Sequence, residues 1–481
     1  MIVAVYIAAT TLLGIYLGRG QAGNRDYFLG GHRLPTWALL VSIVATETST
    51  VTFLSVPGKT YVEGGSFTFL QLTFGYIIGR FAVILFLLPG YFRGEMLSAY
   101  QVLEQRFGVT TRRLASLVFL VTRNLADGLR LFLTALALQL ALDVDMVTCI
   151  LVTTIATAVY SAVGGVRSVV WNDCVQFAVY MLGALAAAAL LITQIPGGWS
   201  EVVAFGDSSG RWRLLDFDFS LTKPAITFWV GCIGGGFLSL ASHGVDQLIV
   251  QRYLCAKSRS AAAWALGLSG FVVLAQFALF LLIGVLLACF NNATGGIGEG
   301  IAGDEAFMTY VVKHMGAGLK GLILAAVLSA AMSTIASSLN SSASSLVADW
   351  LAPRLPNLDD RQSLRLARLL TLFFAAVQGA VALGAYWITM EQAIVDSVLK
   401  IAGFAIGLLL GLYGLSLIAP QTSERVALIA FAIGTAVTTF AAFGTPLSGY
   451  WYTLVGSSTI VIVGLILGAF IHRRGATRMP R

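Results

Sequence analysis

The feature that most restricts how this chain can fold is a succession of apolar segments, each about 20 residues long, over almost its whole length. A helix of about 20 mostly apolar residues is long enough to cross the hydrocarbon core of a bilayer. We therefore predict an all-α polytopic membrane protein with about 13 transmembrane helices. The predicted spans are 2–18, 36–56, 67–92, 113–138, 143–163, 168–194, 225–246, 262–290, 319–347, 364–387, 393–418, 425–444 and 450–471.

The composition supports a membrane protein. Of the 481 residues, 11% are charged, whereas a soluble globular domain carries about 25%. The 51 glycines also suit membrane helices, which contain more glycine than soluble ones. This composition argues against a cytosolic enzyme, a secreted disulfide scaffold and a disordered regulator. The net charge of +7 comes without a dense Lys/Arg run, so it does not indicate nucleic-acid binding.

The distribution of Lys and Arg predicts the orientation. If the N-terminus lies outside, the loops that face inward hold about three times as many Lys and Arg as the outer loops, as the positive-inside rule requires. We therefore predict a multi-pass protein of the cell membrane, with the N-terminus outside and the C-terminus in the cytoplasm.

Two predicted spans contain residues that interrupt helices. Residues 41–61 are rich in hydroxyls, include Glu47 and end near Pro57-Gly58, and residues 231–247 include three consecutive glycines. The two segments are five spans apart, so they belong to halves of opposite topology. Paired interrupted helices in inverted halves indicate a transporter binding site, because backbone groups that leave a helix in the membrane must line a cavity.

The segment 328–350 carries an unusual number of hydroxyls for an apolar helix. Ser333, Ser337 and Ser341 recur every four residues and share one face. Such side chains commonly bond to the carbonyl four residues earlier and let helices pack closely. We accept this interpretation for most of them. For Ser333 and Thr334 we favour a role as sodium ligands.

Four stretches together resemble the sodium:solute symporter family. They are the hydroxyl-rich residues 41–58 and 328–342, YSAVGGVRSVVWNDCVQ at 160–176, and DQLIVQRYLCAKS at 246–258. The resemblance implies a LeuT-type 5+5 inverted-repeat core with one extra N-terminal and two extra C-terminal helices. The implied divisions are 1–33 (N-terminal helix and inner loop), 34–195 (first repeat), 196–224 (outer loop), 225–419 (second repeat) and 420–481 (C-terminal helices and tail).

The resemblance also implies where sodium binds. In the main site, backbone carbonyls bind the ion at positions that match Ala45 and Thr48 in the first broken helix and Ala330 in the hydroxyl-rich segment. Two hydroxyls complete the site, at positions that match Ser333 and Thr334. A second, deeper site matches Asp173, Ser333 and Ser337, but Ala336 stands where a further hydroxyl is expected. The number of sodium ions per transport cycle is therefore either one or two. Asp173 lies near the cytoplasmic end of its segment, so it is alternatively a solvated residue.

Glu47 lies between the two carbonyl positions of the main site. A carboxylate in mid-membrane costs about 2.5–3.5 kcal/mol or more, so it needs a partner or a function. We favour a coupling function, in which Glu47 attracts the cation or titrates with transport. The alternative is a structural hydrogen bond to the broken backbone.

Arg123, Asp127 and Arg130 share one face of the fourth span. We expect Asp127 to pair with one arginine and to leave the other for an anionic solute, since guanidinium binds carboxylate bidentately. By resemblance the solute cavity lies near Ala126. We choose Arg130, because Arg123 is nearer the cytoplasmic end and can snorkel. A purely structural role is the alternative.

Further polar residues are predicted to line the solute cavity. They are Thr52, Gln71, Thr73, Tyr76, Ser239, Ser242 and His243. Ser242 and His243 match family positions beside the solute. A lone histidine on a helix is nevertheless more often part of the structure than a ligand.

No Walker A motif, zinc pattern or pair of catalytic carboxylates is present. We therefore predict a sodium-coupled secondary active symporter, not an enzyme, that imports a small organic solute by alternating access. Arg130 favours a carboxylate or an acidic sugar, while neutral sugars, amino acids and vitamins remain alternatives. Proton coupling through Glu47 and a non-transporting membrane sensor are the competing functions. The predicted partners are the solute, Na+ and the lipid bilayer, without nucleic acid.

Overall fold

The computed structural model describes residues 1–481 except 22, 95, 143, 224, 356, 389, 391 and 477–481, and these described residues form helices and no strand. Four short helices lie in connections: α2 (Asn24–Leu29), α7 (Gln101–Arg106), α10 (Gly198–Ser208) and α14 (Gly303–His314). The other principal helices are α1 (Ile2–Leu17), α3 (Thr36–Glu47), α4 (Thr50–Tyr61), α5 (Gln71–Ala82), α6 (Leu88–Tyr91), α8 (Val109–Leu142), α9 (Met146–Gln194), α11 (Gly235–Gly244), α12 (Gln247–Leu254), α13 (Arg259–Thr294), α15 (Ala317–Leu346), α16 (Asp360–Trp387), α17 (Gln392–Ile418), α18 (Glu424–Gly444) and α19 (Tyr452–Ala476).

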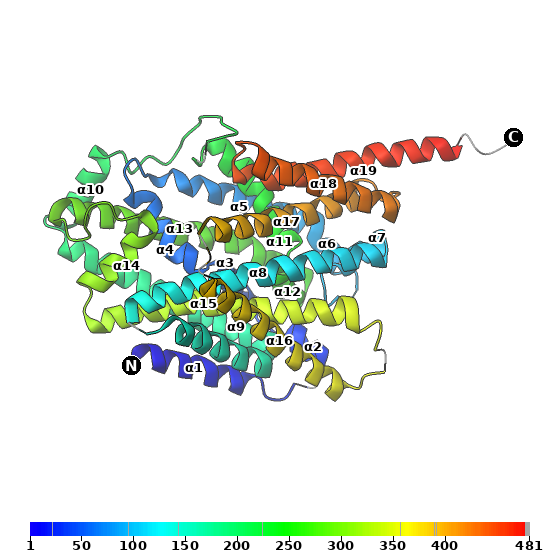
Figure 1. Cartoon of the computed structure of the whole chain (residues 1–481), viewed down its shortest axis with the longest axis horizontal. Coiled ribbons are helices and arrows are strands. Elements are labelled where there is room, and N and C mark those ends of the chain that lie inside the picture. The colour runs from blue at the N-terminus through cyan, green and yellow to red at the C-terminus, as the bar shows by residue number, and fades with distance from the viewer. Residues whose placement is uncertain are drawn as a thin grey trace.

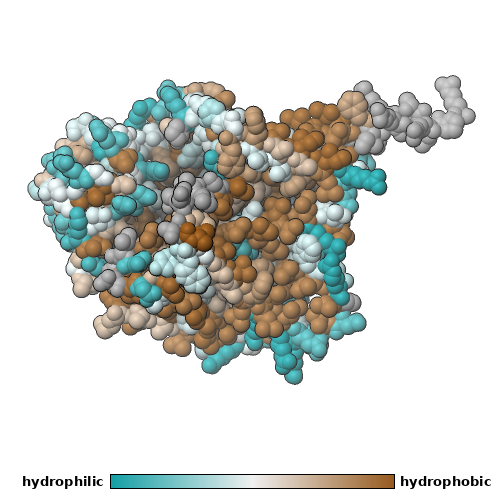
Figure 2. Space-filling model, in the orientation of Figure 1, coloured by the Kyte–Doolittle hydropathy of each residue, from teal (hydrophilic) through white to brown (hydrophobic). Residues whose placement is uncertain are grey.

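Most long helices run along the longest axis of the molecule (Figure 1). The N-terminus lies at the same end as α10 and α14, whereas α19 leaves the bundle at the opposite end, where α7 also lies. A brown apolar belt crosses the surface between hydrophilic ends (Figure 2). Large apolar side chains such as Phe86, Leu182 and Phe373 are exposed. An exposed apolar belt between polar ends is the surface that a bilayer covers.

The count of thirteen spans is not confirmed. By length and hydropathy, eight of the described helices can cross a membrane, or nine if the bent pair Asn24–His32 and Thr36–Glu47 is one span. The difference has physical causes. The helix α1 has 16 residues, the broken helices are short, and α8 carries several charges.

The helix α9 combines two predicted spans. It has 49 residues, which at 1.5 Å per residue corresponds to about 74 Å, more than twice the bilayer core. Inside it, Gly165 has φ 53° and ψ −156°, which is not helical. A Cβ at this position would lie 2.5 Å from the Tyr27 carbonyl oxygen. The joint therefore requires glycine and falls between the predicted spans 143–163 and 168–194.

The first predicted interruption is confirmed, and it lies at two hydroxyl residues, Thr48 and Ser49. The helix α3 ends at Glu47, Thr48 and Ser49 are extended, and α4 begins at Thr50. The Ser49 Oγ accepts a hydrogen bond from the Thr52 amide at 3.3 Å and so caps α4. The chain continues as a helix through Pro57, so the proline does not mark the break.

The second interruption exists, but its glycines do not form it. Residues Gly234, Gly235 and Gly236 are helical, and the break comes at Val245 and Asp246, between α11 and α12. Gly235 and Gly236 instead let α11 meet α5 backbone to backbone. A Cβ on Gly75 would lie 2.5 Å from the Gly236 amide nitrogen. Close approach through small residues is how membrane helices commonly associate.

We predict that Ser49→Ala lowers the stability of the sodium-free protein by about 1 kcal/mol, whereas Ser49→Gly costs a few tenths. Both substitutions remove the capping hydroxyl, but glycine adopts the non-helical backbone of the N-cap position more easily than alanine does. Thermal unfolding in detergent measures the difference. Ser55→Ala, in the body of the same helix, is the control. Equal melting temperatures for the Ala and Gly variants would show that the cap contributes little.

Candidate functional site

The hydroxyl-rich segment forms the interior of the bundle. In the span Ala317–Leu351, 94% of the most apolar window is buried, so α15 does not face lipid. Several hydroxyls bond within their own helix, as expected: Ser329 donates to the Ala325 carbonyl at 2.7 Å, and Ser341 donates to the Ser338 carbonyl at 3.1 Å. The predicted sodium ligands behave differently.

Thr334 joins α15 to the end of α3. Its Oγ1 lies 3.3 Å from the Thr46 carbonyl oxygen and 3.2 Å from the Ala330 carbonyl oxygen. The last carbonyls of a helix lack intrahelical partners, so the end of α3 presents oxygens to this hydroxyl. Ala45, Thr46 and Thr48 are buried there. The two elements predicted to hold the main sodium ion are therefore in contact.

Ser333 faces a different partner, the carboxylate of Asp173. The Ser333 Oγ donates to Asp173 Oδ1 at 2.6 Å, and the Ser42 Oγ donates to Asp173 Oδ2 at 2.5 Å. Asp173 is fully buried, so its interpretation as a solvated residue is wrong. Ser333 precedes Thr334 by one residue on α15, yet its hydroxyl meets Asp173 of α9.

Arg252 reaches the same carboxylate from α12. Its Nη2 lies 3.7 Å from Asp173 Oδ2 and donates hydrogen bonds to Ser337 and Thr46. Arg252 lies between the predicted spans 225–246 and 262–290 and was therefore expected in an inner loop, but the residue is completely buried. A cation partner for Asp173 was thus missed, because the sequence does not show that α12 folds back into the bundle.

Glu47 also has a buried cationic partner, Arg80 of α5. The Arg80 Nε donates to the Ser269 Oγ at 3.1 Å, and His243 Nε2 lies 3.5 Å from Glu47 Oε2. Sequence analysis missed Arg80. The signal was available, since a mid-membrane acid needs a partner and Arg80 lies inside the predicted span 67–92. An ion pair with Arg80 makes proton coupling through Glu47 the weaker alternative.

The charges of α8 form a network with the second break. Asp127 accepts from Arg123 Nε at 2.6 Å and from Arg130 Nη1 at 2.7 Å. Arg123 Nη1 also lies 3.4 Å from Asp246 Oδ2, and Asp246 caps α12 through the Leu248 amide at 2.9 Å. The expectation that one arginine lacks a carboxylate is therefore wrong. The choice of Arg130 as a solute ligand stays a prediction.

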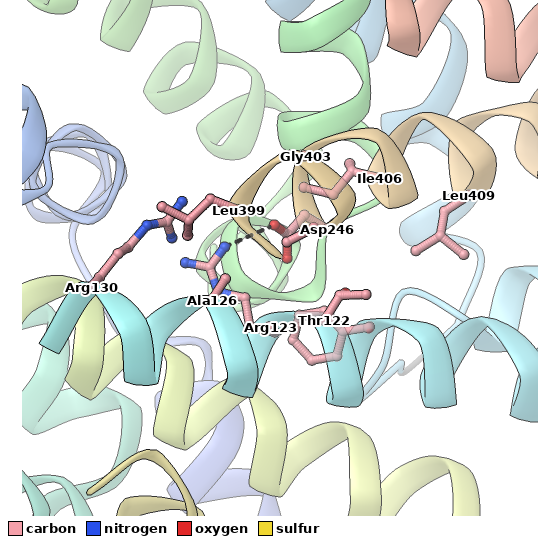
Figure 3. A pocket seen from close by; sticks show the side chains of 11 residues that line it. Thr122, Arg123, Ala126, Arg130, Asp246, Leu399, Gly403, Ile406 and Leu409 are labelled. Carbon is pink, nitrogen blue, oxygen red and sulfur yellow. Dashed lines mark hydrogen bonds and ion pairs between the residues drawn. The ribbon is translucent and has the colours of Figure 1, made fainter. Parts of the chain in front are cut away.

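A cavity of about 70 Å³ separates α8 from α17. Figure 3 shows Arg123, Ala126 and Arg130 on α8 facing Leu399 and Gly403 on α17, with Asp246 beside them. The Arg130 side chain is 35% exposed, and its ion pair with Asp127 uses one nitrogen. Its remaining N–H donors suit an anionic ligand.

A second, smaller cavity is also lined by Arg130. Its lining includes Ser49 and Thr50 at the first break, together with Asp127, Arg130 and Thr334. Arg130 thus borders both cavities, and Thr334 borders the second. The structure places a cationic side chain next to the predicted main sodium site.

The other predicted solute residues line neither of these two cavities and instead contact their own or neighbouring helices. Gln71 Nε2 bonds to the Ile226 carbonyl at 3.1 Å, and the Ser239 Oγ bonds to the Tyr76 carbonyl at 2.9 Å. The shorter-range contacts are Thr73 Oγ1 to the Leu70 carbonyl at 2.7 Å, Ser242 Oγ to His243 Nδ1 at 2.9 Å, and Thr52 Oγ1 to Ser49 Oγ at 3.3 Å. A solute role for these residues stays a prediction.

Two broken helices that present backbone oxygens, hydroxyls and a cationic side chain near the middle of a helical bundle define a secondary transporter. The fold agrees with that of a solved Na+-coupled sialic acid symporter in a substrate-bound outward-open state. The TM-score is 0.88 at 27% sequence identity, covering 98% of this chain and 97% of the other. The LeuT-type fold is confirmed.

Sequence comparison defines the family. The profile of the sodium:solute symporter family matches residues 27–434, and the chain belongs to this family. The sodium/sialic acid symporter NanT of Aliivibrio fischeri is 28% identical, covering 96% of this chain and 91% of NanT. The sodium-coupled monocarboxylate transporter 2 of Danio rerio is 26% identical, covering 90% of this chain and 70% of that protein. The chain is a sodium-coupled symporter of small solutes.

Proposed function

We propose that this symporter imports a carboxylated solute, and that a sialic acid is the first substrate to test. The observation that carries the proposal is the position of Arg130, which borders both cavities next to the first helix break. Guanidinium binds carboxylate through paired hydrogen bonds. Asp127 has two arginine partners, so a solute carboxylate can engage Arg130 while Asp127 keeps Arg123.

The similar proteins support an acidic solute. The relatives include a sodium/sialic acid symporter and a sodium-coupled monocarboxylate transporter, and sialic acid and monocarboxylates both carry a carboxylate. A neutral solute would place no charge against Arg130. An acidic sugar additionally offers hydroxyls, which suit the polar side chains around the first break.

Sodium would bind where Thr334 meets the end of α3. The oxygens would come from Ala45, Thr48, Ala330 and Thr334. For Ser333 to bind the same ion, its hydroxyl would have to turn away from Asp173. Ion binding would join two elements whose separation opens the site, so occupancy biases the conformational equilibrium. Entry of one sodium into a negative interior releases about 2.3 kcal/mol per 100 mV.

A carboxylated sugar requires the site to open. Pockets for small molecules measure about 300–1,000 Å³, whereas the cavity between α8 and α17 measures about 70 Å³. The wall opposite Arg130 is formed by residues of α17, such as Leu399 and Gly403. We infer that α17 moves away from α8 when solute enters.

The proposed orientation has the N-terminus outside and the C-terminus in the cytoplasm. The N-terminus lies at the end that carries α10 and α14, which belong to the predicted outer connections. The proposed repeats, 34–195 and 225–419, each contain one broken helix.

Uptake of radiolabelled N-acetylneuraminic acid into proteoliposomes tests the function. We expect accumulation with an inward sodium gradient and background uptake with choline in its place. An inward proton gradient without sodium should also give background, because Glu47 is paired with Arg80. Glucose, which lacks a carboxylate, should not compete. Competition by glucose but not by acidic sugars would overturn the proposed solute class, and uptake driven by protons alone would overturn sodium coupling.

A further inference from the structure

The last residue of α3, Glu47, is paired with a buried cation of another helix. Arg80 of α5 forms an ion pair with the Glu47 carboxylate, and the Arg80 and Glu47 side chains are 0% and 20% exposed. Glu47 stands between Ala45 and Thr48, whose carbonyls are proposed above as ligands of the main sodium ion. We propose that Arg80 positions these carbonyls through Glu47 and so sets the sodium affinity of the transporter. This role rests on the proposed main sodium site.

The backbone that carries these carbonyls has little support of its own. The last carbonyls of a helix have no partner within the helix, and α3 ends here because Thr48 and Ser49 are extended. Helix ends fray when nothing holds them. A frayed end would have to be ordered by the ion on binding, and this ordering would reduce the affinity. The end of α3 therefore binds sodium well only if other parts of the molecule fix it.

Contacts from two neighbours hold this last turn of α3. From α15, the Thr334 hydroxyl bonds to the Thr46 carbonyl. From α5, Arg80 holds the Glu47 carboxylate. The contact with α15 must loosen when sodium leaves and the two elements separate. The contact with α5 does not involve α15, so it keeps the turn in place throughout the transport cycle.

Arg80 is itself fixed, as a positioning residue must be. Its Nε donates to the Ser269 Oγ of α13 at 3.1 Å, and its Cζ lies 5.8 Å from the centre of the Tyr76 ring. The stem is packed as well, since a Cβ on Gly270 would lie 3.2 Å from Arg80 Cδ. A planar guanidinium also presents its donors in fixed directions. Glu47 is therefore bound by a group that cannot readily turn away.

The second interrupted helix reaches the same carboxylate. His243, near the end of α11, places its Nε2 3.5 Å from Glu47 Oε2, and its Nδ1 lies 2.9 Å from the Ser242 Oγ. The His243 carbonyl accepts a hydrogen bond from the Tyr253 hydroxyl of α12. Through Arg80 and His243, Glu47 connects the end of α3 to α5, α11 and α13. The carbonyls proposed to bind sodium are thus fixed relative to both broken helices.

An ion pair suits a positioning role better than a purely stabilising one. Apolar residues of similar size commonly stabilise a buried position as well as an ion pair does, so stability does not require charges here. An ion pair adds direction, and loss of one partner would leave an unpaired buried charge, which is strongly unfavourable. Glu47 and Arg80 therefore stay together, and through them the last turn of α3 keeps its place.

Replacing both partners by apolar residues tests this role. Glu47→Leu/Arg80→Met removes the directional contact without leaving a lone buried charge, so its melting temperature should be no lower than that of wild type. We expect equilibrium binding of ²²Na+ to the purified protein in detergent to weaken about tenfold, because a site that must be ordered on binding loses affinity. In proteoliposomes the sodium concentration for half-maximal uptake should rise by the same factor. The solute concentration for half-maximal uptake, at saturating sodium, should not change. A folded double variant with wild-type sodium affinity would overturn the role of Arg80.

Two further variants show whether the effect is specific. Arg80→Lys keeps a cation beside Glu47 but not the planar fork, so sodium affinity should fall less than in the double variant. Arg112→Met/Asp349→Leu replaces another buried ion pair, in which Arg112 Nε lies 2.7 Å from Asp349 Oδ1 after the end of α15. This control should leave sodium binding unchanged. An equal loss of sodium affinity in the control would assign the effect to stability and contradict a positioning role.

Hydrogen exchange of the wild type decides the question even if the double variant does not fold. Without sodium, the backbone amides at the end of α3 should exchange as slowly as those in the middle of the same helix, because Arg80 already holds the turn. Fast exchange of these amides without sodium, and slow exchange with it, would show that the ion itself orders the turn. That result would remove the positioning role.

The same binding assay separates this role from the proposed sodium site. If Thr334→Ala leaves ²²Na+ binding unchanged, the main sodium site lies elsewhere, and the role of Arg80 fails with it. If Thr334→Ala weakens sodium binding and Glu47→Leu/Arg80→Met does not, the site holds and only the role of Arg80 fails. Binding of ²²Na+ is measured without solute, so neither outcome depends on which solute is transported.

Discussion

Thr334→Ala is expected to raise the sodium concentration for half-maximal uptake by about 10- to 100-fold. Thr334 is the hydroxyl that meets the end of α3, and a hydrogen bond or ligand contact to a charged group contributes about 1.5–3 kcal/mol. Each 1.4 kcal/mol changes an affinity tenfold. Initial uptake rates measured against sodium concentration, at saturating solute, give the shift.

Two variants control this experiment. Thr334→Ser keeps the hydroxyl and should restore most of the sodium affinity. Ser341→Ala removes an equally buried hydroxyl of α15 that bonds within its own helix, and it should leave the sodium dependence unchanged. Ser333→Ala examines the second predicted hydroxyl in the same assay. If neither Thr334→Ala nor Ser333→Ala alters sodium dependence, the main sodium site has been assigned wrongly.

Arg130→Ala is expected to raise the solute concentration for half-maximal uptake by about 100-fold at saturating sodium. Charge-assisted, paired hydrogen bonds to a carboxylate are the strongest that the cavity offers, and losing them costs about 1.5–3 kcal/mol. The fold should tolerate the change, because Arg123 remains beside Asp127. Uptake rates against solute concentration measure the loss, and sodium binding should change little.

Three comparisons make the Arg130 result specific. Arg130→Lys keeps the charge but not the planar fork, so we expect an intermediate loss. Thr122→Ala changes another residue that lines the same cavity, whose hydroxyl bonds within α8 to the Val118 carbonyl, and it should have little effect. The methyl ester of the solute lacks the negative charge, so wild type and Arg130→Ala should bind it with similar affinity. Equal losses of solute and sodium affinity would indicate a structural role for Arg130.

The parts of the molecule that depend on local sequence could be predicted. Hydropathy located the long spans, and glycine at 165 falls between two of them. The hydroxyls around Thr48 and Ser49 indicated the first break correctly. These features depend on residues that are neighbours in the chain, which is the information that a sequence displays.

The second break shows where local reasoning fails. Three consecutive glycines predict a helix interruption because glycine is flexible. Here two of them, Gly235 and Gly236, contact α5 instead, and the chain breaks later, at Asp246. A glycine that frees the backbone and a glycine that admits another helix look the same in a sequence. The partner that decides between them is about 160 residues away.

The buried ion pairs show the same limit. Glu47 with Arg80, and Asp173 with Arg252, are joined by the packing of different helices. Sequence reasoning recognised both acids as unusual but did not find either cation. Arg252 was assigned to a loop because it falls between two predicted spans, and α12 itself is too short to appear as a span.

The backbone contact between α5 and α11 has a consequence for how the protein is made. Each helix comes from a different half of the chain, and the contact needs glycines from both, such as Gly75 in α5 and Gly235 in α11. Until the second half has been synthesised, the glycine face of α5 lies in the bilayer without its partner α11. Assembly of the transporter therefore cannot be completed one half at a time. A truncated chain that stops before α11 would keep that glycine face uncovered.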